Sequence, residues 1–547
     1  MNQQITAPSA LAATWVTPEV RSSFESLGHW TSETWLSLVL ARTEEDPDAV
    51  AVVDQSGALT RGEVLQAASR LAGHLRREGV AAGDVVTLVL PNWREFVVIH
   101  TAVGMIGGVV NPLLPKVGVT EMRHIMRTAG TRYVFAAAAG PGDTPWTSAT
   151  AAAEGLDSVL GVIAVRGDDD LYARTVADPG LELRRADFAE VDAREWDTVT
   201  FTSGTEALPK GVVHSHQTTM FGLRAYIGGV LQLDVQDCVF MPSPICHASG
   251  IQWGLRTAIY AGAPLILQDR WDPAVALELI DRHRCTYTLA ATTFIVDLVA
   301  AKARSTDAAS GTSLRFVASG GAAIPRHLVA EVREAFSAEL MAVFGASETY
   351  VTTATRPGSP EHILATDGEP LPGVEVAIMD EVGQVLPSGA EGEIVTRGPQ
   401  TFLGYLGDQD LTRRAFHGQW YRFGDLGRID EDGMLHVTGR IKDIVIRGGE
   451  NISVREVEEL LVQHPDISSA AVVGYPDDRL GERCCAVVVP AGGRVVDLAL
   501  TTSFLLERGL AKFKLPERLV IVEAMPMTAT GKVKKADLRR FVADSEA

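Results

Sequence analysis

Residues 202–212 read Thr-Ser-Gly-Thr-Glu-Ala-Leu-Pro-Lys-Gly-Val and directly follow a strand-like segment, 198–202. Hydroxyl groups, glycines and a lysine at the end of a strand can hold a polyphosphate, because backbone N–H groups and an ammonium group then surround the anion. The stretch differs from a Walker A loop, which requires Gly-Lys-Ser/Thr where Pro209, Lys210 and Gly211 stand. Taken alone, it fits a Gly/Pro turn on the surface equally well.

Strand-like and helix-like segments alternate on both sides of this loop, which predicts α/β layers with parallel strands. In the segment 61–79, for example, Val64, Leu71 and Leu75 fall on one helical stripe. The expected strands are 49–54, 85–90, 132–137, 198–202, 239–242, 264–267, 286–290 and 314–318, and the expected helices are 61–79, 96–106, 273–283 and 326–336.

The rest of the chain predicts two further kinds of unit. Short strands and turns between 374 and 404 predict a small antiparallel β-barrel or sheet. Residues 168–197 open with three aspartates and stay polar, which is typical of a connection between two lobes. A smaller unit follows Arg440, and its Ser453 and Glu456 have the spacing of a capping box at the start of a helix.

The fold class is therefore predicted as α/β with two domains. A large N-terminal domain, residues 30–440, is expected to hold two α/β subdomains and the small β-barrel. A small α+β C-terminal domain is expected over residues 441–547, which is long enough to form its own core.

Composition excludes several classes of protein. Lys and Arg total 49 and Asp and Glu total 69, so the net charge is −20 and a nucleic-acid partner is not expected. The five cysteines form no Cys-x-x-Cys pair, which favours a reducing compartment and no zinc site. The N-terminus lacks the basic region of a signal peptide, and the apolar run 96–115 is interrupted by polar residues and glycines. A cytoplasmic protein without a membrane span is expected.

Five further motifs follow the loop in order. They are Ser319-Gly320-Gly321-Ala322-Ala323, Phe344-Gly345-Ala346-Ser347-Glu348, Tyr421-Arg422-Phe423-Gly424-Asp425, Gly439-Arg440-Ile441-Lys442-Asp443 and Pro526-Met527-Thr528-Ala529-Thr530-Gly531-Lys532. With this set the chain resembles the adenylate-forming superfamily of acyl-CoA synthetases, aryl-acid ligases, adenylation domains and luciferases. The resemblance implies an ATP-dependent acid–thiol ligase, which transfers AMP to a carboxylate and then passes the acyl group to a thiol.

Transfer of AMP to a carboxylate crowds negative charges around the α-phosphorus, so cations and oriented donors are the main requirement. The resemblance implies Lys532, Glu348 and Lys210 as catalytic residues. Lys532 would bridge the substrate carboxylate and the α-phosphate, and an ordinary solvated lysine is the alternative. Glu348 would bind Mg²⁺, which prefers carboxylate and phosphate oxygens.

The resemblance also implies a nucleotide-binding set. Phe344 would stack on adenine, although a core aromatic residue is the alternative. Asp425 would accept hydrogen bonds from the ribose hydroxyls and Arg440 would donate to the ribose, with a surface ion pair as the alternative. The expected set is Thr202, Ser203, Gly204, Thr205, Gly320, Gly321, Ala322, Phe344, Gly345, Ser347, Asp425 and Arg440.

Fewer residues indicate which carboxylic acid is the substrate. His247 matches the family's histidine at the mouth of the acyl pocket, and Gly321 is expected beside the acyl group. Trp253 could close the pocket, although a core tryptophan is the alternative. The segment 267–273 is similar to that of cyclohexanecarboxylate-type CoA ligases, which favours a bulky alicyclic or aromatic monocarboxylate over a long straight chain.

The resemblance further implies a mobile C-terminal domain. Asp443 matches the hinge about which this domain rotates after adenylation. One arrangement would bring Lys532 to the site, and the other would bring Gly448 and Gly449. Gly449 would line the tunnel for the pantetheine arm of CoA, where a side chain would obstruct the thiol; a simple turn is the alternative.

Three residues depart from the family pattern. Glu206 and Ala207 stand where the family has Thr and Gly, and a carboxylate beside a polyphosphate is electrostatically unfavourable. Phe423 stands where a small hydroxyl residue is common.

The predicted function is an acid–CoA ligase that uses ATP, Mg²⁺ and CoA. Three alternatives remain: an acyl-AMP ligase that loads a carrier protein, an enzyme that performs mainly the thioester half-reaction on supplied acyl-AMP, and a non-catalytic binding protein on the same fold. The expected partners are a carboxylic acid and CoA or a carrier protein, and a homodimer stays open.

Overall fold

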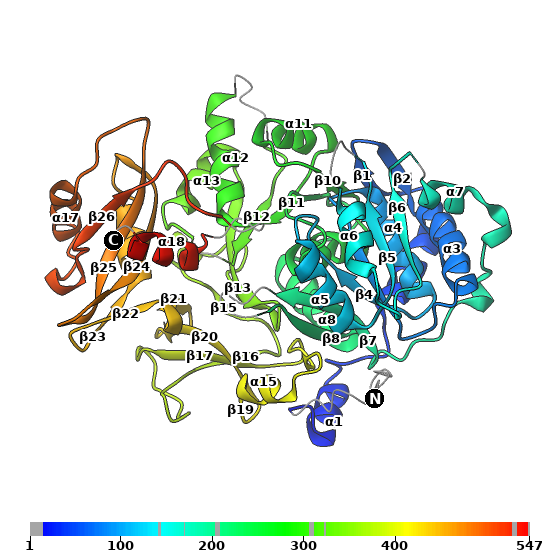
Figure 1. Cartoon of the computed structure of the whole chain (residues 1–547), viewed down its shortest axis with the longest axis horizontal. Coiled ribbons are helices and arrows are strands. Elements are labelled where there is room, and N and C mark those ends of the chain that lie inside the picture. Colours follow the sequence, from blue (N-terminus) through cyan, green and yellow to red (C-terminus); the bar gives the residue numbers. More distant parts are fainter. Residues whose placement is uncertain are drawn as a thin grey trace.

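The computed structural model describes residues 15–139, 144–168, 170–202, 208–305, 311–321, 324–527 and 533–544. In Figure 1, stacked helices and strands form the right-hand and central parts of the molecule. The C-terminal unit forms the left-hand part, around a sheet of its own, and a third group of strands lies below.

A seven-stranded sheet carries both ends of the predicted phosphate loop. Its strands are β3 (Val85–Val89), β4 (Val109–Pro112), β5 (Thr131–Ala137), β6 (Gly161–Val165), β7 (Trp196–Thr202), β8 (Lys210–Ser215) and β18 (Gly404–Tyr405). Their order is β18-β8-β7-β4-β3-β5-β6. The pairs from β7 to β6 are parallel, and β8 and β18 add antiparallel pairs at one edge. β3 is buried at every position, as expected for a central strand covered on both faces.

A nine-stranded sheet forms the second α/β layer. Its strands are β1 (Val50–Asp54), β2 (Gly57–Thr60), β9 (Val239–Met241), β10 (Leu265–Leu267), β11 (Tyr287–Ala290), β12 (Phe316–Gly320), β13 (Glu339–Ala346), β14 (Tyr350–Ala354) and β15 (Glu369–Pro370). The order is β15-β14-β13-β12-β11-β9-β10-β1-β2, with parallel pairs in the middle and antiparallel pairs at both ends.

Helices cover these two sheets. They are α1 (Pro18–Ser26), α2 (Trp35–Glu45), α3 (Arg61–Arg77), α4 (Arg94–Met105), α5 (Val119–Ala129), α6 (Pro145–Ala153), α7 (Leu171–Ala177), α8 (His216–Leu223), α9 (Ala248–Gly250), α10 (Thr257–Ala261), α11 (Pro273–His283), α12 (Thr292–Arg304), α13 (Leu328–Phe336) and α14 (Glu361–Leu364), with the π-helical turns η3 (Arg224–Leu231) and η4 (Ile251–Arg256). Helix α4 contacts β1 of one sheet and β4 of the other, which explains why it is buried from Glu95 to Met105. The predicted α/β layers are confirmed.

The third sheet is an antiparallel half-barrel where a small barrel was predicted. Its elements are β16 (Glu375–Met379), β17 (Gly392–Arg397), α15 (Gln409–Arg414), β19 (Phe416–His417), β20 (Trp420–Ile429) and β21 (Leu435–Arg440). The strand order is β16-β17-β20-β19, and β21 pairs with β20. This last pair sets Asp425 opposite Arg440.

The C-terminal unit has a separate core. Its elements are β22 (Ile444–Arg447), β23 (Glu450–Ser453), α16 (Val454–Leu461), β24 (Ile467–Asp477), β25 (Gly481–Pro490), α17 (Leu498–Glu507), β26 (Arg518–Ile521) and α18 (Lys535–Asp544). Two clusters of buried side chains within it, around Ile452 and Val487, contain only residues from Val445 onward. This sheet therefore has hydrophobic cores that are separate from those of the α/β layers.

Two predictions about connections are wrong. Residues 168–197 do not join two lobes: they run from β6 to β7, which belong to the same seven-stranded sheet, and α7 packs on α3. Ser453 precedes α16 but does not cap it, because its hydroxyl donates to the carbonyl of Thr438 on β21 instead. That hydrogen bond links the C-terminal unit to the half-barrel.

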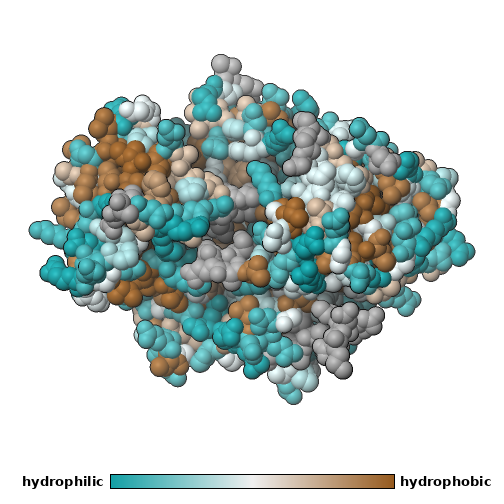
Figure 2. All heavy atoms as spheres, viewed as in Figure 1, coloured by the Kyte–Doolittle hydropathy of each residue, from teal (hydrophilic) through white to brown (hydrophobic). Residues whose placement is uncertain are grey.

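The surface in Figure 2 is mainly hydrophilic, with a hydrophobic patch over the C-terminal unit at the upper left. Exposed apolar residues of that unit include Val495, Leu500 and Ile521. Within the described ranges, we find no helix long and apolar enough to cross a bilayer.

Candidate active site

Three side chains from distant parts of the chain meet beside the predicted phosphate loop. Lys210 begins β8, Glu348 lies in the turn between β13 and β14, and Tyr405 ends β18. Strand β18 pairs with β8, so that Tyr405 lies opposite Val212 and two residues along from Lys210. The neighbouring Phe402 donates its backbone N–H to the carbonyl of Glu348 at 2.7 Å. The edge of one sheet thereby holds the turn of the other.

The three groups form a continuous hydrogen-bonded chain. Lys210 Nζ donates to the hydroxyl of Tyr405 at 2.7 Å, and this hydroxyl donates to Glu348 Oε1 at 2.8 Å. The direct distance from Lys210 Nζ to Glu348 Oε1 is 3.3 Å. The Glu348 side chain is 8% exposed, and within the described residues both of these contacts fall on Oε1. The structure therefore brings the predicted Lys210 and Glu348 together, through a tyrosine that sequence reasoning missed.

The ends of the phosphate loop are fixed by strand pairing. Thr202 and Lys210 are opposite partners in the β7–β8 pair. The Thr202 hydroxyl is buried and has no hydrogen-bond partner among the described residues. The middle of the loop lies outside the described residues. This part contains the predicted Ser203, Gly204 and Thr205, and also Glu206 and Ala207, which depart from the family pattern.

A buried histidine holds the segment that carries Glu348. His214 Nε2 donates to the carbonyl of Ser347 at 2.8 Å, and its Nδ1 lies 3.0 Å from the Thr218 hydroxyl. Burial lowers the pKa of His214 to about 4, so the ring is neutral near pH 7. Its ring stacks on Tyr350 with centroids 4.1 Å apart. Sequence reasoning missed His214, because nothing in residues 210–215 indicates a partner 133 residues away.

The predicted ribose residues are paired with each other. Arg440 Nε donates to Asp425 Oδ1 at 2.8 Å across the β20–β21 pair. The Arg440 side chain is 62% exposed, whereas that of Asp425 is 10% exposed, so solvent screening keeps this pair weak.

The packing of aromatic residues near Asp425 explains why Phe423 departs from the family pattern. The rings of Phe344 and Phe423 lie 4.7 Å apart at 50°, and Phe423 also packs edge-on against Tyr421. Phe423 thus occupies its unusual position as a packing partner of the residue that is expected to stack on adenine.

Two predicted glycines are required by the backbone. A Cβ at Gly320 would lie 2.3 Å from the carbonyl oxygen of Val343, and one at Gly345 would lie 1.7 Å from that of Tyr350. Close strand packing therefore accounts for both glycines, whether or not a nucleotide approaches them. Gly321 has a left-handed φ of 76°, and Ala322 lies outside the described residues.

The predicted acyl-pocket residues lie beside an aromatic cluster. His247 caps α9, and its Nδ1 lies 2.9 Å from the Ser249 hydroxyl. On the following turn, the Trp253 ring packs edge-on against Tyr226 and Tyr350 at 5.3 and 6.1 Å. Trp253 is buried, in agreement with the core alternative.

The predicted hinge residue lies in a charged cluster of the C-terminal unit. Asp443 accepts from Arg539 at 2.6 Å and lies 3.9 Å from Lys535, which pairs with Glu458 at 2.8 Å. Arg455, on α16, lies 3.8 Å from Asp367 before β15. Few polar contacts of this kind join the unit to the large domain within the described residues.

The predicted CoA residues occupy the turn between β22 and β23. Gly448 and Gly449 have φ values of 59° and 89°. No atom of the described residues lies within 4 Å of a Cβ built on Gly449, so its backbone conformation, rather than a neighbour, requires glycine here. Lys532 lies outside the described residues, and its position stays a prediction.

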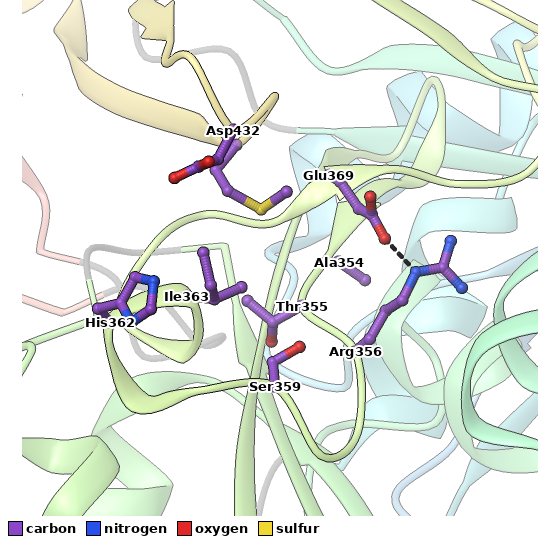
Figure 3. Close-up of a pocket in the computed structure, with 9 residues that line it drawn as sticks. Ala354, Thr355, Arg356, Ser359, His362, Ile363, Glu369 and Asp432 are labelled. Atoms are coloured by element: carbon purple, nitrogen blue, oxygen red, sulfur yellow. Dashed lines mark hydrogen bonds and ion pairs between the residues drawn. The ribbon is translucent and has the colours of Figure 1, made fainter.

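A surface pocket of about 230 Å³ lies apart from these residues. In Figure 3, Arg356 pairs with Glu369 on one side and His362 lies on the other. None of the predicted site residues lines this pocket, so it is not the predicted nucleotide site.

Comparison with known proteins covers almost the whole chain. The model of the family described as "AMP-binding enzyme" matches residues 40–406, and that of the "AMP-binding enzyme C-terminal domain" matches residues 456–532. The medium-chain fatty-acid–CoA ligase of Escherichia coli is 36% identical over 532 residues, which is 95% of this chain and 93% of the relative. Pyochelin synthase PchD of Pseudomonas aeruginosa is 32% identical and covers 98% of both chains. The crystal structure of the anthranilate–CoA ligase AuaEII has a TM-score of 0.85 at 22% identity, over 94% of this chain and 98% of that one.

Proposed function

Because the chain belongs to the AMP-binding enzyme family of adenylate-forming ligases, we propose that it converts a carboxylic acid into its CoA thioester by way of acyl-AMP. As a member it is an ATP-dependent acid–CoA or acyl-AMP ligase. The observation that carries the proposal is the junction of Lys210, Tyr405 and Glu348, next to the buried Thr202 hydroxyl, which has no hydrogen-bond partner among the described residues.

The donor set at this junction suits magnesium and a polyphosphate. Glu348 offers a carboxylate whose Oε2 makes none of the contacts found within the described residues, and Thr202 and Lys210 offer a hydroxyl and an ammonium group. Hard carboxylate and phosphate oxygens are the ligands that Mg²⁺ prefers. When bound, Mg²⁺ would neutralise charge on the polyphosphate.

The remaining chemistry belongs to the chain and its substrates. In the first half-reaction a carboxylate oxygen attacks the α-phosphorus of ATP, and the bond to pyrophosphate breaks. Lys210 would stabilise the departing pyrophosphate, and Lys532 would stabilise the charge shared by the carboxylate and the α-phosphate. In the second, the thiol sulfur of CoA attacks the acyl carbon, the thiol loses its proton and AMP leaves.

We assign the two half-reactions to two arrangements of two domains, residues 30–440 and 441–547, with Asp443 at the hinge. The separate cores of the C-terminal unit support this boundary. The long ion pair between Arg455 and Asp367, at 3.8 Å, also supports the boundary, because such a polar contact can separate when the domains move. In the second arrangement Gly448 and Gly449 would border the CoA thiol.

For the acid, we favour a bulky alicyclic or aromatic monocarboxylate. The segment 267–273 supports this choice, because it resembles that of cyclohexanecarboxylate-type CoA ligases. Straight-chain acids are the competing class, since one relative is a medium-chain fatty-acid–CoA ligase.

The acceptor is proposed to be CoA, with a carrier protein as the second candidate. The carrier protein is kept as a candidate because the chain is similar to a pyochelin synthase over 98% of its length. The need for ATP and CoA implies a cytoplasmic location.

Acid-dependent exchange of labelled pyrophosphate into ATP tests the proposal. We expect exchange with cyclohexanecarboxylate or benzoate to exceed exchange with octanoate, and to stop when Mg²⁺ is removed. Transfer to free CoA and to a phosphopantetheinyl carrier protein then identifies the acceptor. Preference for octanoate would overturn the substrate class. Absence of exchange with any acid, while supplied acyl-AMP is still converted to acyl-CoA, would favour the enzyme of the second half-reaction alone.

A further inference from the structure

Tyr405 belongs to the junction at the centre of the predicted site, but the reaction steps proposed above assign it no task of its own. Its side chain is 2% exposed, and its hydroxyl joins Lys210 to Glu348. We infer that Tyr405 is a positioning residue for adenylation: its hydroxyl prevents Glu348 from closing onto Lys210 as a tight ion pair, and so keeps the carboxylate available to Mg²⁺–ATP. The inference rests on the proposed function, which it deepens.

The distances carry this inference. A charge-assisted hydrogen bond between an ammonium group and a carboxylate is normally about 2.7–2.9 Å long. Here Lys210 Nζ and Glu348 Oε1 are 3.3 Å apart, whereas each is within 2.8 Å of the Tyr405 hydroxyl. The hydroxyl therefore takes the position of closest approach for both charges.

The roles of the hydroxyl are fixed by its chemistry. A phenol has one proton, which it donates to Glu348, and its oxygen accepts from Lys210. An ordinary phenol loses its proton only well above neutral pH. Tyr405 therefore stays protonated near neutral pH, and it interacts as a dipole rather than as a third charge.

The ring is held independently of the hydroxyl. The backbone of Tyr405 pairs with Val212, and the next residue, Leu406, donates to the carbonyl of Gly211 at 2.8 Å. The Tyr405 ring packs edge-on against Phe402 with centroids 4.9 Å apart. A phenylalanine at this position would keep this packing and lose only the hydroxyl.

The loss of that hydroxyl has a defined consequence. Lys210 would lose its neutral acceptor and pair directly with Glu348. Magnesium would then have to displace a stronger partner from the carboxylate. Binding of ATP with Mg²⁺ should weaken by much more than binding of ATP alone, because the tighter pair occupies the carboxylate that Mg²⁺ needs, whereas ATP alone meets only the changed Lys210.

The test compares the full-length protein with Tyr405→Phe. Binding of a non-hydrolysable ATP analogue is measured by calorimetry, with Mg²⁺ and with EDTA. We expect the dissociation constant with Mg²⁺ to rise on the order of tenfold, since the lost hydrogen bond is made to a charged group. With EDTA it should stay within about twofold of the wild-type value.

Two further variants make the test specific. Tyr133 lies on β5 of the same sheet, and its hydroxyl is 3.4 Å from the His74 ring. Tyr133→Phe removes this hydroxyl and should leave the dissociation constants with Mg²⁺ and with EDTA unchanged. Glu348→Gln should weaken the Mg²⁺-dependent binding by itself. Adding Tyr405→Phe to Glu348→Gln should then cause no further loss, because the carboxylate to be protected is gone.

Two results would overturn the inference while leaving the proposed function intact. One is an unchanged dissociation constant with Mg²⁺ in Tyr405→Phe. The other is equal weakening with Mg²⁺ and with EDTA, which would indicate a purely structural role. A wild-type protein that fails to bind the analogue in either condition would instead overturn the proposed function, and the inference with it.

Discussion

At the scale of single residues, His214 shows how a buried neutral ring supports the site. It donates to the carbonyl of Ser347, the residue before Glu348, from a strand that begins with Lys210. The ring must stay neutral, since protonation would give Nδ1 a proton that faces the Thr218 hydroxyl, and a charge would be buried. The sequence predicted Glu348 but not this support.

This arrangement predicts a pH dependence of stability. The pKa of His214 is about 4 in the folded protein and about 6.5 when unfolded. Between these values the unfolded chain binds the proton and the folded chain does not, so stability falls as the pH falls. The neutral ring contributes about 3 kcal/mol to the stability above about pH 6.5, and most of this contribution is lost when the pH has fallen to about 4.

The matched variant is His214→Gln, whose amide nitrogen can replace Nε2 as donor to Ser347 but does not titrate. Urea midpoints at pH 7.5 and pH 5 measure the effect. The midpoint of the wild-type protein should fall more steeply toward pH 5 than that of the variant. Parallel slopes would show that His214 titrates normally in the folded state.

At the scale of elements, one buried ion pair joins the predicted acyl region to the strand that enters the phosphate loop. Arg256, at the end of η4, is completely buried and donates to Asp197 on β7 at 2.8 Å and to the Thr198 hydroxyl at 2.7 Å. Asp197 also accepts from Thr219 on α8 at 2.8 Å. These bonds fix η4 and α8 against β7.

Breaking this pair on one side should therefore be costly. Arg256→Met leaves the Asp197 carboxylate buried without its cation, and should destabilise the protein by about 3–5 kcal/mol. The double variant Arg256→Met with Asp197→Leu should recover much of this loss, because no charge then remains buried. Urea unfolding of both variants measures the difference; a loss below about 1 kcal/mol in the single variant would contradict it.

The sequence predicted elements better than it predicted their connections. Mainly apolar runs such as Val85–Val89, which Thr87 alone interrupts, indicate buried strands directly, because burial on both faces favours apolar residues. The acidic segment 168–197 gave no such signal, and its two ends return to one sheet. Ser453 had the spacing of a capping residue, but the half-barrel offered its hydroxyl a partner that local spacing does not reveal.

The same limit applies to the site. Lys210 and Glu348 were predicted from their motifs, and the structure brings them together. Tyr405, His214 and Arg256 were missed, because their partners lie 57 or more residues away along the chain. Contacts of that kind depend on how the sheets pack, and no local pattern encodes them.

At the scale of the whole molecule, the C-terminal unit is proposed to present two different faces to the site. Gly449→Leu tests the second one. The variant should keep acid-dependent pyrophosphate exchange and lose transfer to CoA by more than about tenfold, because its side chain would enter the path of the thiol. No described atom lies within 4 Å of the new Cβ, so the strain is confined to the φ of 89°.

Gly509→Leu is the matched control for Gly449→Leu. Gly509 lies in the same unit, has a φ of 87° and is equally free of neighbours within the described residues. It should therefore carry the same backbone strain without touching the CoA path. Equal loss of CoA transfer in both variants would attribute the effect to strain and remove Gly449 from the proposed tunnel.

The measurement that tests the central claim most directly is the separate assay of both half-reactions in Lys532→Ala. We propose that Lys532 contacts the carboxylate and the α-phosphate only during adenylation. Acid-dependent pyrophosphate exchange should fall by at least about a hundredfold, while conversion of supplied acyl-AMP and CoA to acyl-CoA should remain near the wild-type rate. An equal fall in both half-reactions would contradict the assignment of the two steps to two arrangements of the domains.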